Sequence, residues 1–444
     1  MKPELAVIGG GYAGFAAAVT LARSGARVTL FEASRTLGGR ARVVEKDGHR
    51  VDNGQHILLG AYSETLRLLR LVGVRPGVLD TRRLALIYPG AADPCELRAA
   101  ALPAPLHLAV GLLRARGLDW ADKLAMVRLL RRLKRDRFRV APDRPVAALL
   151  AETGQTARLS RLIWEPLCVA ALNTPVAAAS AQVFAHVLRD SLAAGASASD
   201  LLLPKVDLSE LFPVPASRWL AMRGHAVRTS EPIRAIEATG DGGYRLDGDP
   251  WHTRYDHVVI ATAPYHVAPL VGALPALAGL VEQLAALRHE PIVTAWLAFD
   301  GPLAFPAPMI GMSGGYGQWA FDRAALGGPD GLVGVVISAS GAHRQISGDA
   351  LEIALLGELQ AILGPLPALK WAQIITEKRA TFACTPGVRR PTGATPEPGI
   401  WLAGDYVASD YPATLESAVQ SGVAAARGIL QRCGLKENSL FRID

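Results

Sequence analysis

A glycine-rich turn near the N-terminus constrains this chain more than any other feature. The apolar residues 5–8 lead into Gly9-Gly10-Gly11-Tyr12-Ala13-Gly14, and an apolar stretch with helical spacing follows. Gly9 permits a tight turn after a strand, Gly11 lets the backbone approach a pyrophosphate, and Gly14 lets the helix pack closely on the sheet. The helix start adds unpaired N–H groups and the positive end of its dipole. We therefore expect a dinucleotide to lie against Gly9, Gly11, Tyr12, Ala13 and Gly14.

An acidic residue follows at the end of the second expected strand. Residues 28–31 are apolar, and Glu32 and Ala33 come directly after them. A carboxylate at this place can accept hydrogen bonds from both ribose hydroxyls of an adenosine. It would repel a 2′-phosphate, so the sequence argues against NADP at this site.

Two later segments favour FAD over NAD. Residues 37–42 contain Gly38, Gly39 and Arg40, which open the backbone and supply positive charge for a diphosphate. Far along the chain, the apolar residues 400–403 lead into Gly404-Asp405, and Pro412-Ala413-Thr414 opens a helix. Asp405 can hold ribityl hydroxyls, and the helix start can stabilise the negative charge of a reduced flavin.

These motifs together resemble the FAD-dependent amine oxidase and phytoene desaturase superfamily, and the resemblance spans the chain. Four further stretches are similar to its squalene-associated branch, the hydroxysqualene dehydroxylases of bacterial hopanoid synthesis. They are residues 52–62, residues 164–167 with 171–175, residues 203–208, and residues 411–416. The resemblance implies that reduced FAD removes the allylic hydroxyl of hydroxysqualene and that squalene is formed.

The fold implied is α/β, with a discontinuous Rossmann-like FAD-binding domain and a mixed α+β substrate domain. We expect the first to comprise residues 1–75, 205–270 and 395–434, and the second residues 76–204 and 271–394. Helices are expected to dominate between residues 75 and 200, and strands are expected at 292–299 and 331–338. By resemblance, Ile233 lies in the segment whose backbone touches the adenine.

The catalytic candidates are single residues rather than motifs. The resemblance places Gly54, Gln55 and His56 near the flavin, and the usual pKa of histidine suits a proton donor. Asp52 is a candidate to orient that imidazole. Further candidates are Tyr411 and Tyr62 as alternative donors within the substrate region, and Glu165 and Asn173 at the substrate hydroxyl. Trp164 is a candidate to stack against a polyene.

Composition indicates a globular protein that handles an apolar compound. Half of the 444 residues are apolar. Residues 1–4 lead directly into the first strand, and no apolar run is long enough to span a bilayer, so we expect a cytoplasmic location. The cysteines 95, 168, 384 and 433 show no metal or CxxC spacing, so we expect no metal and no disulfide. Some relatives attach flavin to a cysteine in the direction of Cys384, but we expect non-covalent FAD.

A basic stretch follows an apolar one between residues 99 and 140. Eight lysines and arginines of residues 123–139 alternate with leucines and a valine at helical spacing. Such a helix can lie on anionic lipid, and the proline-broken stretch before it can form an entrance for a lipid substrate. A solvated helix face is the other interpretation, and both remain open. Nucleic acid is disfavoured, because no recognition motif accompanies the charge.

Other functions remain to be compared. The same cofactor lobe serves isoprenoid desaturases, which run the redox step in the opposite direction with oxidised FAD. Amine oxidation is disfavoured, because residues 290–295 lack the lysine that amine oxidases carry near the flavin. A prenyl-lipid carrier without flavin is a third possibility, which the presence of Glu32, Arg40 and Asp405 disfavours. For a reductive reaction, the single nucleotide motif implies an external reductant or reductase.

Overall fold

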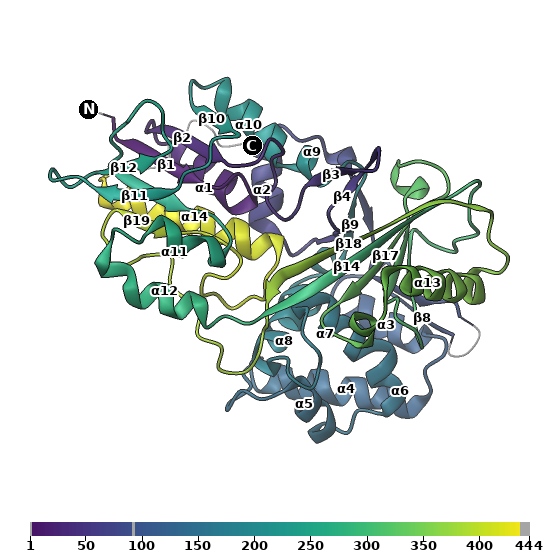
Figure 1. Ribbon diagram of the computed structural model, residues 1–444. Coiled ribbons are helices and arrows are strands. Elements are labelled where there is room, and N and C mark those ends of the chain that lie inside the picture. Colours follow the sequence, from purple (N-terminus) through teal and green to yellow (C-terminus); the bar gives the residue numbers. More distant parts are fainter. Residues whose placement is uncertain (1, 91–93, 436–444) are drawn as a thin grey trace.

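The computed structural model describes residues 2–90 and 94–435, arranged as two lobes (Figure 1). The first lobe is built on a parallel sheet in the order β10 (Ala226–Thr229), β2 (Arg27–Glu32), β1 (Glu4–Ile8), β13 (His257–Ile260) and β19 (Ile400–Leu402). Its strands come from three separate stretches of the sequence, so the lobe is discontinuous.

Two helices cross closely on one face of this sheet. Every residue of α1 (Tyr12–Ala22) is buried, and α14 (Leu415–Arg432) packs against it. Their distance is set by Gly422, where an added Cβ would lie 2.1 Å from the carbonyl oxygen of Ala13. Helices α2 (Ser63–Leu71) and α10 (Pro213–Ala221) complete this layer, and the hairpin of β11 (Ala235–Ala238) and β12 (Tyr244–Asp247) flanks the sheet.

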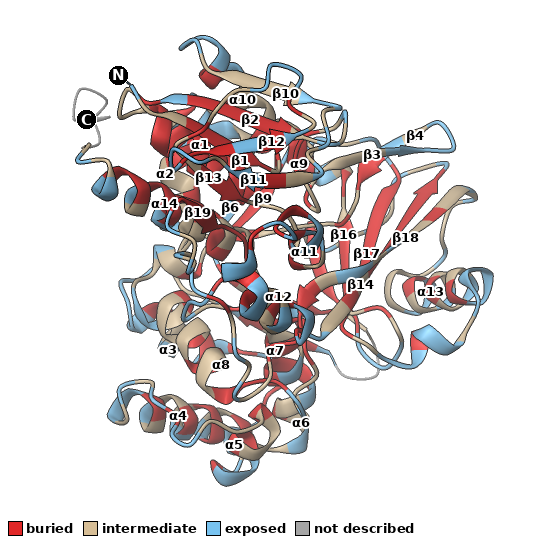
Figure 2. Ribbon diagram, turned by 60° about the vertical axis from the view of Figure 1, so that its left-hand side comes forward, coloured by how far each residue is buried: buried red, intermediate tan, exposed pale blue. Residues whose placement is uncertain are grey.

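The second lobe contains a long antiparallel sheet. Its order is β15 (Met309–Gly311), β16 (Trp319–Asp322), β17 (Leu332–Ser338), β14 (His289–Phe299) and β18 (Leu369–Phe382). Helix α13 (Gly348–Leu363) buries Leu351, Leu355 and Leu359 against one face. The sheet strands are largely buried, whereas the outer side of α13 is exposed (Figure 2).

A helical part lies below this sheet in Figure 1. It comprises α3 (Leu106–Arg114), α4 (Trp120–Arg135), α5 (Val146–Glu152), α6 (Ala157–Leu159), α7 (Glu165–Leu172) and α8 (Ala181–Leu188). Helix α4 begins at a capping box between Asp119 and Asp122. It ends before Arg137 and Phe138, whose positive φ angles interrupt a helix, so the basic helix is shorter than the basic stretch.

Helices predominate from residue 75 to 200, as expected, but the first part of this range contains strands that were not expected. Three short strands precede the helices: β6 (Leu79–Arg82), β7 (Ala85–Tyr88) and β8 (Cys95–Arg98). Strands β6 and β5 (Leu58–Leu59) both pair with β9 (Leu201–Pro204), more than a hundred residues away in the sequence. Strands this short depend on partners distant in sequence, so local patterns do not reveal them.

The remaining described helices and strands surround these sheets. They are the hairpin of β3 (Val43–Lys46) and β4 (His49–Asp52), and helices α9 (Leu208–Leu211), α11 (Val267–Leu270) and α12 (Ala278–Ala285). Within the described ranges, no helix combines the length and apolarity needed to cross a membrane. The α/β class with a parallel nucleotide-type sheet and a mixed second lobe is confirmed.

Candidate functional site

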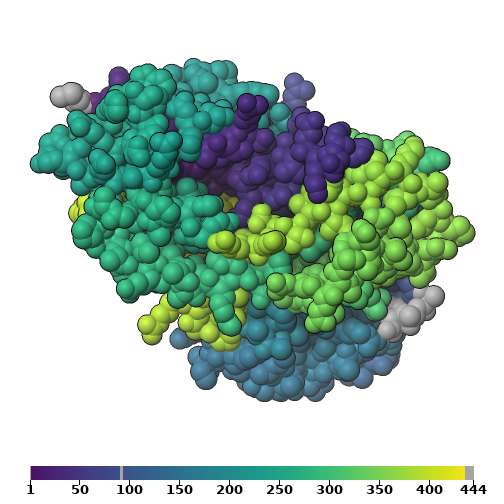
Figure 3. Space-filling model, viewed as in Figure 1, coloured from purple at the N-terminus to yellow at the C-terminus, as the bar shows by residue number. Residues whose placement is uncertain are grey.

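A cavity of about 1770 Å³ is lined by segments of both lobes. Pockets that hold one small ligand usually measure about 300–1,000 Å³. This cavity therefore has room for a large cofactor together with a second compound. Figure 3 shows how segments distant in sequence meet there, with the purple N-terminal region flanked by teal and yellow-green regions.

One end of the cavity is formed by the glycine turn between β1 and α1. At Gly9 and Gly14 an added Cβ would meet protein backbone at 2.6 Å and 1.9 Å, so these glycines are required by the fold itself. Gly11 differs, because its nearest neighbour would lie 3.8 Å away. A Cβ at Gly11 meets no protein atom closely, and Gly11 lines the cavity. Its lack of a side chain therefore fits close approach by a ligand rather than by protein.

Glu32 is held rigidly at the end of β2. Its two carboxylate oxygens accept hydrogen bonds from the backbone N–H of Gly10 at 2.7 Å and of Ser34 at 2.8 Å. Each oxygen has a second lone-pair site, and the side chain lines the cavity. Both oxygens can therefore still accept ribose hydroxyls. Ala33 and Ile233 line the same end.

Arg40 and Asp405 both line the cavity and form an ion pair. The guanidinium lies 2.6 Å from the carboxylate and also donates to the carbonyl oxygen of Ala380. Gly38 and Gly39 have positive φ angles, and an added Cβ at Gly38 would lie 2.4 Å from the carbonyl oxygen of Ala41. Asp405 thus neutralises part of the Arg40 charge, and an anion placed in the cavity could interact with the same guanidinium.

The start of α14 faces the same space. Thr414 caps the helix, and its hydroxyl accepts from the N–H of Ser417 at 3.1 Å. Pro412, Ala413 and Thr414 line the cavity, as does Gly404 just after β19. The positive end of the helix dipole therefore points toward the cofactor end, where negative charge would be stabilised.

A buried polar atom at this end has no protein partner. The hydroxyl of Thr262, just after β13, is buried and unpaired in the described residues, and Thr262 lines the cavity. A buried hydroxyl without a partner is costly. Together with Gly11 and Glu32, it indicates that the site is shaped for a polar dinucleotide, so the residues present fit FAD.

His56 lines the cavity and lies near enough to Arg40 for that charge to act on its imidazole. Its Nδ1 is 2.8 Å from the carbonyl oxygen of Gly54, which can only accept, so Nδ1 carries the hydrogen. Burial, together with the Arg40 charge, lowers the pKa of His56. The neutral ring presents the Nε2 lone pair, and no group of the described residues is recorded as bonded to that nitrogen. Gly54 and Gln55 line the cavity beside it.

Asp52 does not orient this imidazole. Its carboxylate accepts from the N–H of Leu208 at 2.9 Å, and its backbone carbonyl accepts from the indole of Trp296 at 3.0 Å. Burial raises the pKa of Asp52 to about 6. The strand alternation turns this side chain away from the cavity, and the carbonyl of Gly54 holds His56 instead.

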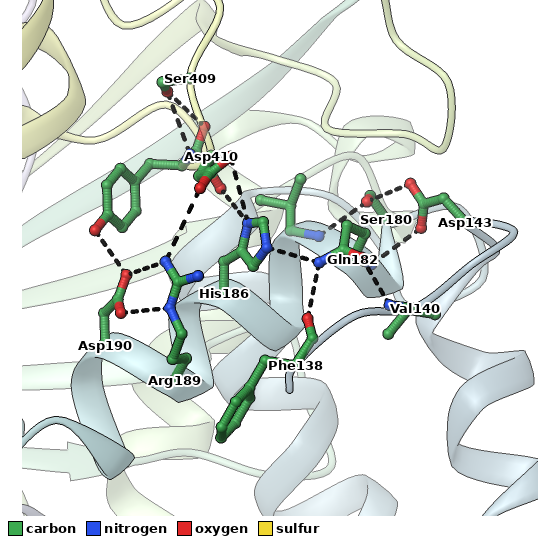
Figure 4. A network of polar contacts seen from close by, with 12 residues as sticks. Phe138, Val140, Asp143, Ser180, Gln182, His186, Arg189, Asp190, Ser409 and Asp410 are labelled. Atoms are coloured by element: carbon green, nitrogen blue, oxygen red, sulfur yellow. Dashed lines mark hydrogen bonds and ion pairs between the residues drawn. The ribbon is translucent and has the colours of Figure 1, made fainter. Parts of the chain in front are cut away.

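Tyr411 is hydrogen-bonded to Asp190, which belongs to the polar network drawn in Figure 4. Its hydroxyl donates to Asp190 at 2.6 Å, and Arg189 binds the same carboxylate at 2.7 Å. Burial raises the pKa of Tyr411 to about 12, and the Asp190 contact adds to the shift. His186 and Gln182 continue the network toward Phe138. Tyr411 lines the cavity, but its only proton is already donated.

The Asn173 side chain forms hydrogen bonds to β14, to β18 and to the residue after β17, so its polar atoms are already bonded within the protein. At its left-handed position after α7, its amide nitrogen donates to Thr381 at 2.9 Å and its oxygen accepts from the N–H of Ala339 at 2.6 Å. Both ends of the amide are therefore used by protein. This geometry argues against a role in hydroxyl binding, although Asn173 lines the cavity.

Two of the three substrate-binding candidates line the cavity, and the third does not. Trp164 is buried, lines the cavity and donates its indole N–H to Gln155 at 2.8 Å. Tyr62 also lines the cavity, beside the start of α14. Glu165 is exposed at the start of α7 and is absent from the cavity wall. Helical rotation turns it away from its neighbour Trp164, so that candidate is not retained.

Away from the glycine turn the cavity wall is mostly apolar, although Arg131, Lys134, Arg189 and Asp190 also belong to it. Its residues come from the helical part, the short strands and the long sheet, and they include Leu86, Leu112, Leu130, Ile163, Leu167, Phe184, Ile292, Met309 and Phe321. A wall of this kind favours a hydrocarbon chain and offers few partners to a polar substrate.

The sequence did not indicate several residues of this wall. Arg189 and Asp190 lie in a π-helical segment (Arg189–Ala193), and Ile163 lies in another (Ser160–Trp164). Such segments are frequent at functional sites, but sequence does not reveal them. The hydroxyl of Thr294 on β14 is buried and unpaired among described atoms, although Thr294 does not line the cavity.

The cysteines and possible metal ligands offer no second centre. Cys95, Cys168 and Cys384 are buried, Cys433 is partly buried, and no disulfide joins any of them in the described part of the chain. In the described part of the chain, no group of three or more His, Cys, Asp or Glu side chains is placed to hold a metal.

Comparison with known proteins gives a consistent picture. The family described as flavin containing amine oxidoreductase matches residues 12–430. The chain is 31% identical to hydroxysqualene dehydroxylase of Rhodopseudomonas palustris, over 97% of this chain and 99% of that protein. It is 27% identical to the protein of the same name from Zymomonas mobilis, over 95% and 97%. Identity to zeta-carotene desaturase of Synechocystis is 24%, over 96% and 97%.

Solved structures agree on the fold. Cyclohexylamine oxidase from Brevibacterium oxydans superposes with a TM-score of 0.67 at 20% identity, over 98% of this chain and all of that one. An oxidoreductase from Methanosarcina mazei gives a TM-score of 0.73 at 14% identity, over 96% and 99%. The chain belongs to the flavin containing amine oxidoreductase family and, within it, to the hydroxysqualene dehydroxylases, and it is an FAD-dependent oxidoreductase.

Proposed function

We propose that this protein uses non-covalently bound FAD to convert hydroxysqualene into squalene by reductive dehydroxylation. The observation that carries the proposal is the single cavity with a dinucleotide-type end and an apolar end. A substrate of this class has one hydroxyl on a long hydrocarbon. The hydrocarbon matches the apolar wall, and the hydroxyl would lie near His56.

Reduced FAD supplies a hydride, and the protein provides the surroundings for its transfer. The glycine turn and Glu32 would hold the adenosine and pyrophosphate, while Asp405 and the start of α14 would hold the ribityl chain and the flavin. Cys384 does not line the cavity, which supports non-covalent binding. The apolar wall would exclude water from the carbon that receives the hydride.

His56 is our proposed proton donor. The reaction replaces a C–O bond by a C–H bond, and the departing hydroxide takes a proton to leave as water. With Nδ1 fixed on Gly54, only Nε2 can reach the substrate oxygen. The lowered pKa keeps most His56 neutral near pH 7 but makes its protonated form a stronger acid. Tyr411 is less suited, because Asp190 already accepts its proton.

The electrons must come from outside this chain. We propose an external reductant or a partner reductase, because only one nucleotide site is built into the described residues. We also propose a cytoplasmic location, where such a reductant is available.

Replacing His56 tests the proposed role of its side chain. His56→Ala should lower kcat by about 100-fold, the lower end of general-acid contributions. The wild-type rate should rise as pH falls toward the lowered pKa, and the variant should lose this dependence. FAD content, measured by absorbance, should not change, and His252→Ala on an exposed loop is the matched control. An unchanged kcat, or loss of flavin from His56→Ala, would refute the role.

Isoprenoid desaturation is the alternative, and the similarity to zeta-carotene desaturase favours it over other reactions. It requires oxidised flavin to take a hydride from the lipid. Anaerobic bleaching of the oxidised enzyme by phytoene or dehydrosqualene would support this alternative. An oxidised enzyme that stays yellow with both lipids would exclude it for these substrates.

A further inference from the structure

Exposed apolar side chains are concentrated on one short part of the chain. Eight large hydrophobic residues of the described chain are exposed, and five of them lie between residues 102 and 124. They are Leu102 (39% exposed), Leu106 (54%), Leu113 (57%), Trp120 (66%) and Leu124 (61%). The helices α3 and α4 that carry or flank them lie in the helical part of the molecule (Figures 1 and 2). Single exposed leucines are ordinary, but such a cluster indicates a contact surface.

The sequence of α4 is unusual for a helix face in water. Its buried side, with Ala125, Met126 and Leu129, packs in the core. Trp120 and Leu124 are one turn apart on the other side and point into solvent. A solvated face would carry polar side chains at these two positions, so the first turns of α4 do not fit that interpretation.

The following turns of α4 are strongly basic. Residues 114–139 contain ten lysines and arginines against three aspartates. Arg132 and Arg135 pair with Asp136. Arg131, Lys134 and Arg137 are exposed, and no ion pair is recorded for them with any described residue. A cluster of free cations beside exposed apolar groups is complementary to an anionic, partly apolar surface.

The cavity opens beside this cluster. Pro105, Ala109, Arg131 and Lys134 line the cavity and are also exposed, so the cavity meets solvent between α3 and α4. Leu108, Leu112, Val127 and Leu130 continue the wall inward from the same two helices. The exposed apolar residues of α3 and α4 are therefore carried by the same two helices as an entrance whose interior is largely apolar as well.

We propose that this surface docks on an anionic lipid bilayer and places the cavity entrance against the membrane. We call it the docking face: Leu102, Leu106, Leu113, Trp120 and Leu124, with Arg131, Lys134 and Arg137. The leucines and Trp120 enter the headgroup region while the cations bind lipid phosphates. The docking itself does not depend on the proposed function. Only the identity of the transported compound does: a lipid substrate that passes between the bilayer and the cavity without crossing water.

Vesicle sedimentation of the FAD-loaded protein tests the docking face without any substrate. The wild type should bind vesicles of phosphatidylcholine mixed with phosphatidylglycerol, bind phosphatidylcholine alone more weakly, and lose affinity as salt rises. Leu106→Ser with Leu124→Ser should weaken binding roughly 100-fold, about ten-fold for each buried side chain. Arg131→Gln with Lys134→Gln should weaken binding to the anionic vesicles roughly 25-fold, about five-fold for each cation.

Matched controls remove similar side chains elsewhere. Met222 (76% exposed) and Ile353 (71%) are exposed apolar residues far from this segment in the sequence, so Met222→Ser with Ile353→Ser should bind vesicles like the wild type. Arg245→Gln with Lys370→Gln should likewise leave binding unchanged. The FAD content and circular dichroism of each variant check that the fold is kept.

Three results would overturn the proposal. The first is that the wild type does not bind anionic vesicles, and the second is that the control variants lose as much binding as the docking-face variants. The third is that the protein forms a dimer in solution, that Leu106→Ser with Leu124→Ser dissociates this dimer, and that no vesicle binding is seen. The last result would assign the surface to a second copy of the chain. Leu106 and Leu124 do not line the cavity, so activity on detergent-dispersed substrate should survive in that variant. If the wild type binds vesicles but never converts hydroxysqualene, the docking face stands and the proposed function fails.

Discussion

The two ends of the cavity are built in different ways. The end that we assign to FAD is formed by backbone groups, glycines and a few charged side chains from short motifs. At the substrate end, single apolar side chains from many elements form a wall with no repeated pattern. Backbone geometry demands particular residue types at fixed spacing, whereas an apolar wall accepts many combinations. The cofactor can therefore be read from the sequence, but the shape of the substrate space cannot.

A substitution at Gly11 should have the largest effect on FAD binding, because it fills the space beside this residue. Gly11→Ala adds a Cβ with no protein atom closer than 3.8 Å, and its φ of −86° suits alanine. The protein should fold, but the pyrophosphate would meet the new methyl group. FAD affinity should fall by up to roughly 100-fold, typical of overpacking. Titration of the apoprotein with FAD, followed by flavin fluorescence, measures this change.

Gly14 and Gly357 provide the contrast. An added Cβ at Gly14 would lie 1.9 Å from the carbonyl oxygen of Gly9, so Gly14→Ala should damage folding itself. Gly357 has open space around it in α13, and Gly357→Ala should change neither property. Unchanged FAD affinity in Gly11→Ala would place the pyrophosphate elsewhere.

Asp52 lies at the junction between the two lobes, where it bonds to Leu208 and to Trp296, and its ionisation should affect the free energy of unfolding. Its pKa in the folded protein is raised to about 6 from 3.8, so the folded state holds this proton more tightly than the unfolded state. Its contribution to the free energy of unfolding is thus present at low pH and is lost as pH rises from about 4 to about 6. The loss amounts to about 3 kcal/mol for a shift of this size.

Asp52→Asn keeps an acceptor for the N–H of Leu208 and removes the titration. The pH dependence of its unfolding free energy between pH 4 and 7, measured by urea denaturation, should be correspondingly flatter than that of the wild type. The exposed residue Asp330 offers the control Asp330→Asn, which should keep the wild-type slope. Equal slopes in Asp52→Asn and the wild type would mean that Asp52 ionises normally in the folded protein.

A polar group in the apolar wall should affect the lipid and leave FAD alone. Leu167 lines the cavity from α7. Leu167→Gln keeps the approximate size but adds an amide without a partner, which should raise KM for the lipid about ten-fold, near the lower range for such burial. FAD affinity should match the wild type. A parallel loss of both ligands would show that the two ends are not independent.

The smallest expected effect concerns Glu32. Glu32→Gln keeps one acceptor oxygen and loses the charge, so FAD affinity should fall about five-fold, the scale of one hydrogen bond. Glu237→Gln on the exposed β11 strand is the control. Because Glu32 does not touch the apolar end, KM for the lipid at saturating FAD should not change. No loss of FAD affinity would remove Glu32 from the nucleotide site.

Sequence reasoning succeeded where spacing is dictated by backbone geometry. The β1–α1 turn, Glu32 and the segment before α14 were predicted by residue type, and all lie around one cavity. It failed where a side chain's direction depends on tertiary packing. Asp52 turned toward Leu208, Asn173 was taken up by neighbouring strands, and Glu165 faced solvent. Strands β6, β7 and β8 were missed, because four-residue strands depend on distant partners or on packing.

An anaerobic reaction of the FAD-loaded, chemically reduced protein with hydroxysqualene tests the central claim most directly. Lipid extracted at successive times is analysed by mass spectrometry while flavin absorbance is followed in the same sample. We predict squalene in a one-to-one ratio to reoxidised flavin, with no reaction when the flavin starts oxidised. Reduced flavin that stays reduced, with hydroxysqualene unchanged, would contradict the account.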